Sequence, residues 1–263
     1  MVLSLGAGVQ SSVLYLMACE GLITPKPDYA IFADTQVEPE WVHEQLAYLQ
    51  RVGNVPIKVV TRSNLGEFVM GDSKEAALTV PFWVDPGNGK PSPGRRQCTF
   101  NWKINVVHQA VREILGLKPR QHAQGRFGIQ EWVGISTDEA QRMKPSRWPW
   151  KTTRWPLIEA GMSRADCLAW AEERGHPVPK KSSCFFCPYR QEKEWARWAV
   201  EEPELFEKAC EFDEAIRHKG AAHGYSEEQF VAKSLRPLRM VAALPVADEP
   251  DHFGNECEGM CGV

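Results

Sequence analysis

The chain has 263 residues, of which 43% are hydrophobic and 25% charged, and its formal net charge is −3. This length suits one large α/β domain with a smaller appendage, and the charge argues against a generic nucleic-acid coat protein. No apolar run reaches the roughly 18 residues that span a bilayer, and no signal peptide opens the chain, so we expect a cytoplasmic protein without membrane contacts.

The first predicted element is an apolar strand over 2–5, which runs into the turn Gly6-Ala7-Gly8-Val9-Gln10-Ser11-Ser12 and a helix over 11–22. A strand that enters a helix through small residues gathers backbone N–H groups where the helix dipole favours an anion. Ser11 and Ser12 add hydroxyl donors. The turn therefore predicts a bound phosphate or sulfate group, and with it an enzyme.

Two well-known phosphate loops fit this turn poorly. A Walker loop needs a lysine after the glycines, and none follows here. In a dinucleotide-binding fingerprint, Gly6 and Gly8 take the first two glycine positions, but Ser11 takes the third. Asp34 would then be the acid that binds the ribose, so a nicotinamide-dependent dehydrogenase remains an alternative.

Further strands are predicted over 29–33, 57–60 and 132–135, with helices over 39–52 and 103–116. Alternating strands and helices predict a doubly wound parallel sheet, that is, an α/β fold. Proline and glycine crowd the second half of 61–97, which we interpret as a mobile lid or substrate loop, the alternative being an inert surface insertion.

From residue 161 the sequence becomes helical and carries cysteines. Ser163-x-x-Asp166 predicts a capped helix start, and an amphipathic helix is expected around Phe212. We therefore expect two domains, a nucleotide-binding α/β domain over 1–160 that includes the long loop 61–97, and a helical region over 161–263.

The cysteines indicate metal or redox chemistry, since disulfide frameworks are rare in the cytosol. Cys184-Phe-Phe-Cys187-Pro188 suits an iron–sulfur cluster, and a zinc knuckle and unliganded thiols are the alternatives. Cys257 and Cys261 lie in a short tail from which a thiolate would attack sulfur or carry a persulfide, unless they are incidental.

A basic, tryptophan-rich segment occupies 142–155, with five basic residues and three tryptophans. Cationic side chains suit phosphates and indoles stack on bases, so the segment is compatible with a tRNA or DNA acceptor. A tryptophan-rich packing loop is the alternative, and the sequence does not separate the two.

Aligned on its serine pair, the turn 6–12 resembles the PP-loop of the ATP pyrophosphatase and phosphoadenylylsulfate (PAPS) reductase superfamily, S-G-G-x-D-S-[ST]. Gly6 replaces the leading serine of that motif and Gln10 replaces its aspartate. Further segments resemble PAPS reductase-like proteins in the same order along the chain: Asp34-Thr35 with Glu38, Cys98-x-x-x-x-Lys103, Gly134-Ile135 with Glu139 and Arg142, Trp155-Pro156-Leu157, and Cys184-x-x-Cys187-Pro188.

This resemblance implies a HUP or PP-loop Rossmann-like fold in which 6–12 cradles the phosphates of ATP or PAPS. The same resemblance assigns the other residues of the site. Asp34 and Thr35 would lie beside the adenosine, with Gly134 and Glu139 nearby, and Lys103 and Arg142 would neutralise anionic charge in catalysis. A magnesium ion is compatible with Asp34, Asp138 or Glu139, although Gln10 is a poorer magnesium partner than aspartate.

The resemblance further implies a 4Fe–4S cluster held by Cys98, Cys184 and Cys187, or a structural zinc at the same thiols. Relatives with the cluster carry two adjacent cysteines where this chain has Gln97-Cys98, so Cys257 or Cys261 is expected as the fourth ligand, unless one iron stays open. Reductases of the family also use a catalytic cysteine in a C-terminal Glu-Cys-Gly segment, which Glu256-Cys257 resembles.

The leading functional hypothesis is therefore an ATP-dependent sulfurtransferase that thiolates a nucleic-acid or small acceptor through an AMP-activated intermediate, with a separate sulfur donor. The first alternative is a sulfonucleotide (PAPS or APS) reductase served by a thioredoxin-like reductant. The second is a catalytically inactive, zinc-stapled protein that binds nucleotide or nucleic acid. A homodimer is compatible with all three.

Overall fold

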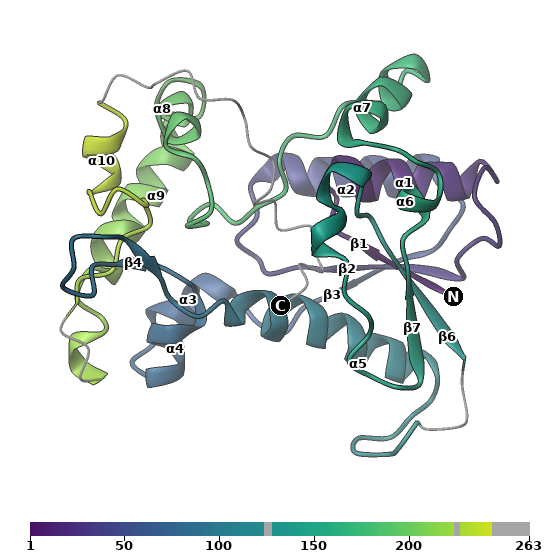
Figure 1. Cartoon of the computed structure of the whole chain (residues 1–263), viewed down its shortest axis with the longest axis horizontal. Helices are drawn as coiled ribbons and strands as arrows, with labels where there is room; N and C mark the ends of the chain where they lie inside the picture. The colour runs from purple at the N-terminus through teal and green to yellow at the C-terminus, as the bar shows by residue number, and fades with distance from the viewer. Residues whose placement is uncertain (124–127, 224–226, 244–263) are drawn as a thin grey trace. The chain divides into compact units, whose positions relative to one another are not determined.

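The computed structural model describes residues 1–123, 128–223 and 227–243 (Figure 1). These residues divide into two compact units: unit 1 contains 1–62 and 101–182, and unit 2 contains 63–100 and 183–243. In the described part of the chain, no helix is both long and apolar enough to cross a membrane.

Unit 1 is built on a five-stranded parallel sheet of order β3-β2-β1-β6-β7. Its strands are β1 (Val2–Leu5), β2 (Tyr29–Ala33), β3 (Ile57–Val60), β6 (Ile129–Val133) and β7 (Lys151–Arg154). In the register of the sheet, Leu3 of β1 lies opposite Ala30 on one side and Trp132 on the other. The chain order reverses between β1 and β6, so the topological switch point lies at the carboxyl ends of these two strands.

Helices cover both faces of this sheet, because its central strands are apolar on both sides. On one face, Leu3 and Phe32 pack with Leu14 in a core to which four helices contribute. These helices are α1 (Val9–Cys19), α2 (Glu40–Val52), α6 (Pro156–Glu159) and α7 (Arg164–Glu173). On the other face, Ile31 packs against Val107 of α5 (Asn105–Ile114). Figure 1 shows α1 and α5 on opposite sides of the strands. The predicted doubly wound α/β fold is confirmed.

The division into units differs from the predicted boundary at residue 160. Helix α7 belongs to unit 1, because its Cys167 and Ala171 are buried in the same core as α1. The predicted capping box that starts this helix is present, with Ser163 and Asp166 each accepting a hydrogen bond from the other's backbone N–H. The boundary was predicted from the order of the elements along the chain. A compact unit is instead defined by which helices and strands pack against one another.

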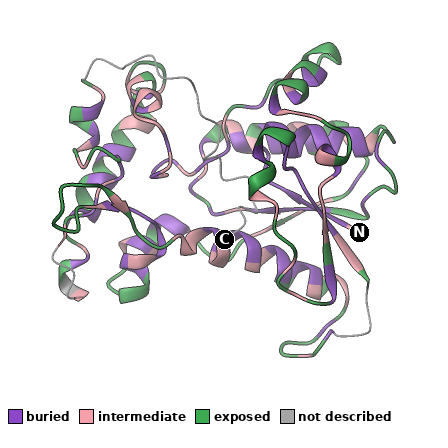
Figure 2. Cartoon of the chain, viewed as in Figure 1, coloured by how far each residue is buried: buried purple, intermediate pink, exposed green. Residues whose placement is uncertain are grey.

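Unit 2 joins two stretches of chain that are far apart in sequence. Its elements are α3 (Leu65–Met70), α4 (Lys74–Thr79), the antiparallel pair β4 (Trp83–Val84) and β5 (Ser92–Pro93), α8 (Glu192–Glu201), α9 (Pro203–Ile216), a 3-10 turn (Ala221–His223) and α10 (Leu238–Val241). Its core contains the stacked rings of Phe186 and Phe212, 4.0 Å apart, and the buried side chain of Cys210. Figure 2 shows buried and exposed stretches along the helices of this unit.

Residues 61–97, interpreted from the sequence as a mobile lid or substrate loop, contain regular helices and strands. Two short helices form there because each has a side-chain cap: Asn64 Oδ1 accepts from Glu67 N, and Ser73 Oγ accepts from Ala76 N. The proline- and glycine-rich part closes on itself as the β4–β5 pair. After this stretch, a π-helix (Thr99–Ile104) leads into α5.

Candidate functional site

The loop between β1 and α1 is held in shape by one serine. Ser11 Oγ accepts a hydrogen bond from Gly6 N at 3.2 Å and donates to Gly8 O at 3.4 Å. Ala7 has a φ of +55°, in the left-handed region that L-residues seldom adopt, and Gly8 caps the helix with an extended backbone. The Ser11 hydroxyl is therefore used in hydrogen bonds within the loop.

Ser12 is placed differently, since its Oγ is buried and has no hydrogen-bond partner among the described residues. It lies in the first turn of α1, whose leading backbone N–H groups have no acceptor within the helix. The helix starts at the carboxyl end of β1, at the switch point of the sheet, where open α/β sheets bind their ligands. The loop thus has the features of an anion site, with Ser12 as its available hydroxyl.

Gly134 forms the wall opposite this loop. A Cβ at this position would lie 2.9 Å from Ser11 N and 3.0 Å from Ser11 Cα. Backbone atoms cannot give way as a flexible side chain does, so only glycine lets the segment after β6 approach the loop this closely. The structure therefore brings Gly134 beside the predicted phosphate loop and gives a steric reason for its glycine.

Gln10 joins the loop to two other segments through a buried polar network. Its Nε2 donates to Glu139 Oε2 at 3.1 Å and to Ser136 Oγ at 3.3 Å, and its Oε1 accepts from Arg164 Nη1 at 2.9 Å. Glu139 is also ion-paired with Arg142. The neutral amide thus serves an anion on one side and a cation on the other, a pairing that a carboxylate would not provide. The predicted residues Gln10, Glu139 and Arg142 are brought together.

The sequence did not single out Ser136 or Arg164. Ser136 lies between Gly134 and Glu139, which were noticed in the sequence, so its position in the segment after β6 was the available signal. Arg164 follows Ser163, and the capping box fixes it as the first residue of α7. Helix propensity says nothing about which neighbour such a residue meets, and only the packing of α7 on α1 brings Arg164 to Gln10.

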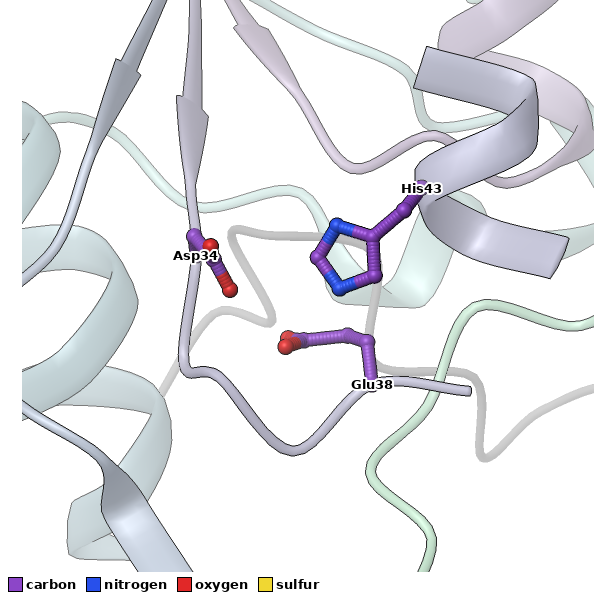
Figure 3. A group of neighbouring side chains, drawn as sticks. All are labelled: Asp34, Glu38 and His43. Carbon is purple, nitrogen blue, oxygen red and sulfur yellow. The ribbon is translucent and has the colours of Figure 1, made fainter. Parts of the chain in front are cut away.

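A second group of polar side chains lies at the carboxyl end of β2. The donor atoms of Asp34, Glu38 and His43 lie within 4.8 Å of one another (Figure 3). Glu38 Oε2 accepts from the backbone N–H of Thr35 at 3.2 Å, and its Oε1 lies 3.7 Å from Lys103 Nζ. Four residues noticed in the sequence, Asp34, Thr35, Glu38 and Lys103, therefore lie together, and His43 is one that the sequence analysis missed.

The basic segment 142–155 is largely a packing element. It contains the strand β7, where Lys151 forms a buried ion pair with Glu131 of β6, and Arg154 is paired with Glu159. Trp148 stacks on His108 of α5 with ring centroids 3.8 Å apart. Because these side chains make contacts inside the protein, they contribute little to a surface that could bind nucleic acid. The strand was missed because its sequence, Lys-Thr-Thr-Arg, carries no apolar pattern.

A cavity of about 280 Å³ lies between this segment and the sheet. Its lining includes the Glu131–Lys151 pair, the aliphatic side chains of Ile104, Val133 and Ile135, and basic and aromatic residues. The cationic lining residues are Arg142, Lys144, Arg147 and Lys151. Two of these cations are already ion-paired, Lys151 with Glu131 and Arg142 with Glu139, so the positive charge of the lining is partly neutralised.

In unit 2, the two cysteines of the C-x-x-C motif lie at either end of a tight turn. Cys187 N donates to Cys184 O at 3.1 Å, while the residues between them, Phe185 and Phe186, are buried in the aromatic core. The turn is anchored by its apolar middle, and both cysteines are partly exposed. In C-x-x-C metal sites, a turn of this kind brings two thiolates to one metal ion.

Cys98 lies in a neighbouring segment of the same unit. The guanidinium of Arg96 lies 4.6 Å above the ring of Tyr189, so the chain two residues before Cys98 meets the chain two residues after Cys187. None of the six described cysteines is in a disulfide. A metal at Cys98, Cys184 and Cys187 stays a prediction, and Cys257 and Cys261 lie outside the described residues.

Fold and site together define a class: a doubly wound α/β protein with a candidate anion loop at the switch point of its parallel sheet. No protein-family model matches the sequence, and no curated protein matches it. A solved structure of similar fold is that of the phosphoadenylyl-sulfate (PAPS) reductase from Candida auris in a phosphate complex. It is 14% identical, with a TM-score of 0.40, and the match covers 69% of this chain and 79% of that chain. At this identity the likeness concerns the fold alone.

Proposed function

We propose that this protein binds an adenine nucleotide at residues 6–12 and uses it in sulfur chemistry, as an ATP-dependent sulfurtransferase. The observation that carries the proposal is the loop at the switch point, where α1 begins and where the buried hydroxyl of Ser12 has no hydrogen-bond partner among the described residues. The phosphates would lie against this helix start, and Asp34 and Thr35, at the end of the neighbouring strand, would lie beside the adenosine.

The proposed chemistry has two steps. An acceptor oxygen attacks the α-phosphate of ATP, so an O–P bond forms, the bond to the β-phosphate breaks and pyrophosphate leaves. The terminal sulfur of a persulfide on Cys257, loaded by a sulfur donor, then attacks the activated carbon, and AMP leaves with the acceptor oxygen. Attack of Cys261 on the Cys257 sulfur releases the thiolated acceptor and leaves a disulfide, which a thiol reductant returns to two thiols.

Cationic side chains would balance the charge of the nucleotide and of a nucleic-acid or small anionic acceptor. Arg142, held by Glu139 beside the loop, also lines the 280 Å³ cavity with Lys144 and Arg147. Positive charge near the transferring phosphoryl group stabilises the transition state more than the ground state. The cavity is accordingly the place proposed for the acceptor or for the leaving pyrophosphate.

The thiols of unit 2 suit a 4Fe–4S cluster or a zinc ion. Cys184 and Cys187 are partly exposed at the ends of one anchored turn, with the Cys98 segment alongside, and the fourth coordination position of the cluster is proposed to be open. When bound, a cluster with one open iron would hold an extra sulfide for transfer. The protein's own contribution is to present three thiolates from one compact unit.

A sulfonucleotide reductase is the second candidate, and Gln10 is the observation that favours it. Its amide is fully committed between Glu139 and Arg164, so this position offers no carboxylate to a magnesium ion. PAPS reduction needs no magnesium-bound pyrophosphate leaving group. In that reaction a tail thiolate attacks the sulfur, and the nucleotide leaves.

Product analysis on anaerobically purified protein separates the candidates. Pyrophosphate and AMP formed from ATP only with a tRNA, DNA or small acceptor would support sulfurtransfer. Sulfite released from PAPS with a dithiol reductant would support the reductase. Nucleotide binding with neither product would leave the inactive binding protein, and failure to bind ATP or PAPS would overturn the proposal. The Ser12→Ala variant is the control for binding at the loop.

A further inference from the structure

Three side chains that bind metals in proteins meet at the carboxyl end of β2 (Figure 3). Asp34 directly follows the strand, Glu38 lies in the loop after it, and His43 lies near the start of α2. Their donor atoms lie within 4.8 Å of one another. Within residues 1–123, 128–223 and 227–243, this is the one group of three histidine, cysteine or carboxylate side chains found gathered so closely.

The loop that carries the two acids is fixed by its own backbone. Asp34 N donates to Val60 O of β3 at 2.8 Å, and Asp34 Oδ1 accepts from Gln36 N at 2.7 Å. The neighbouring acid, Glu38, has Oε2 bound to Thr35 N at 3.2 Å. Each carboxylate therefore uses one oxygen to hold the loop and has a second oxygen for another partner. Ligands held in this way are positioned before the ion arrives.

Glu38 supplies an independent sign of a missing partner. Its side chain is only 2% exposed, and its Oε1 accepts no hydrogen bond from the described residues. The cation paired with it, Lys103 Nζ, lies 3.7 Å away, beyond hydrogen-bond distance. Burying a carboxylate oxygen without a donor is costly, and Asp34 adds a second negative charge close by. A bound cation would coordinate that oxygen and offset the negative charge that the single cation Lys103 leaves on the two acids.

From these observations we propose that Asp34, Glu38 and His43 bind one divalent transition-metal ion, of the class of Mn²⁺, Fe²⁺ and Zn²⁺. Two carboxylate oxygens and one imidazole nitrogen suit these ions, whereas magnesium and calcium prefer oxygen alone. Three protein ligands leave positions open for water or for a substrate oxygen. The site adjoins the switch point, since β2 is next to β1 in the sheet, but it does not depend on the proposed sulfur chemistry.

Mn²⁺ added to the full-length, metal-free protein without nucleotide tests the proposal, because manganese binds poorly to the thiolates that would capture zinc. Electron paramagnetic resonance counts the bound ion, and electron spin echo modulation detects a coordinating histidine nitrogen. We expect one Mn²⁺ per chain with a nitrogen signal. His43→Ala should abolish that signal and weaken binding at least tenfold, and Glu38→Gln should weaken binding at least tenfold.

Glu44→Gln is the matched control, because Glu44 is an exposed acid on the same helix as His43. It should bind Mn²⁺ like the wild type, and so should Cys184→Ser. Thermal unfolding without metal establishes that each variant folds, and His43→Gln replaces His43→Ala if the latter does not. An unchanged affinity and nitrogen signal in the folded His43 variant, or no stoichiometric binding by the wild type, would overturn the proposal. Neither result bears on whether the loop binds nucleotide.

Discussion

Arg164 Nη1 donates a hydrogen bond of 2.9 Å to Gln10 Oε1, although 154 residues separate the two along the chain. The bond ties the start of α7 to the start of α1, at the loop where an anion is expected. On its other side, the Gln10 amide nitrogen donates to Glu139, which follows β6. One neutral side chain thereby holds three segments of the switch point in place.

Replacing Gln10 by leucine should therefore destabilise unit 1. Arg164 and Glu139 would each lose one hydrogen bond in a buried site, which costs about 2–3 kcal/mol for groups of this kind. The midpoint of urea unfolding measures the loss. Gln50→Leu on the exposed face of α2 is the control and should change the midpoint little. Equal midpoints for the two variants would show that the network does not stabilise the fold.

The two loop serines should respond differently to alanine. Ser12→Ala should weaken binding of ATP or PAPS about tenfold or more, since a hydrogen bond to a charged group is worth about 1.5–3 kcal/mol, while stability stays unchanged. Ser11→Ala should also lower stability by about 1 kcal/mol, because Ser11 bonds Gly6 and Gly8. Calorimetric titration and urea unfolding measure both effects. If the Ser12→Ala variant binds nucleotide with wild-type affinity, the loop is not part of the binding site.

A methyl group at Gly134 should displace the phosphate loop. The added Cβ meets the backbone of Ser11 at 2.9 Å, an overlap that costs about 1–3 kcal/mol where neighbours cannot move aside. We expect Gly134→Ala to lower both stability and nucleotide affinity. Gly128→Ala is the matched control, since its Cβ would meet nothing within 4 Å. If the two variants bind nucleotide equally well, the loop tolerates the shift and the proposed site lies elsewhere.

Iron, acid-labile sulfide and zinc contents of anaerobically purified protein test the cysteine prediction. We expect about four irons and four sulfides per chain, lost in Cys98→Ala and in Cys184→Ala. Cys19→Ala is the control, because Cys19 packs at the edge of the unit 1 core. Stoichiometric zinc that disappears in the same two variants would assign a structural metal to these thiols instead. Unchanged metal content in both would remove them as ligands.

The predicted parts of the fold were those where local pattern and tertiary contact agree. The strands β1, β2 and β3 were placed at 2–5, 29–33 and 57–60, where the structure has them. The inner strands β1 and β2 are largely buried and therefore nearly continuously apolar, whereas β3 lies at the edge of the sheet and was found through its Ile and Val residues. β7 was missed, because its register on β6 depends on the buried Glu131–Lys151 pair, and an ion pair leaves no hydrophobic signal in the sequence. The helices in 61–97 were missed because proline and glycine content outweighed two short capping signals.

Some residues of the candidate site could likewise be predicted from the sequence, and others could not. The loop 6–12, Gly134 and Glu139 were found through a motif, and the structure brings them together at the switch point. His43 and Arg164 belong to no such motif. Each lies near the start of a helix that had been predicted. Its place in the candidate site depends on its position within that helix and on the segment that its side chain contacts. These relationships are three-dimensional and leave no spacing to recognise.

His108 should make stability depend on pH. Burial, and then the positive charges of Lys151 and Arg112, lower its pKa from 6.5 to about 4, and its Nδ1 has no hydrogen-bond partner within the described residues. The unfolded chain therefore takes up a proton on this histidine as the pH falls below about 6.5, whereas the native protein resists until about 4. Its contribution to stability is complete above pH 6.5 and is lost as the pH falls from 6.5 to 4.

We expect this loss to be about 1–2 kcal/mol, with allowance for solvent screening at this half-buried side chain. His108→Phe keeps an aromatic ring against Trp148 and removes the titrating group, so its stability should fall less than that of the wild type between pH 7 and 4. Urea unfolding at a series of pH values measures the difference, which isolates His108 from the carboxylates that titrate in the same range. His218→Gln, at an exposed histidine of unit 2, should keep the wild-type pH dependence. Parallel curves for wild type and His108→Phe would show that the native protein binds this proton as readily as the unfolded chain.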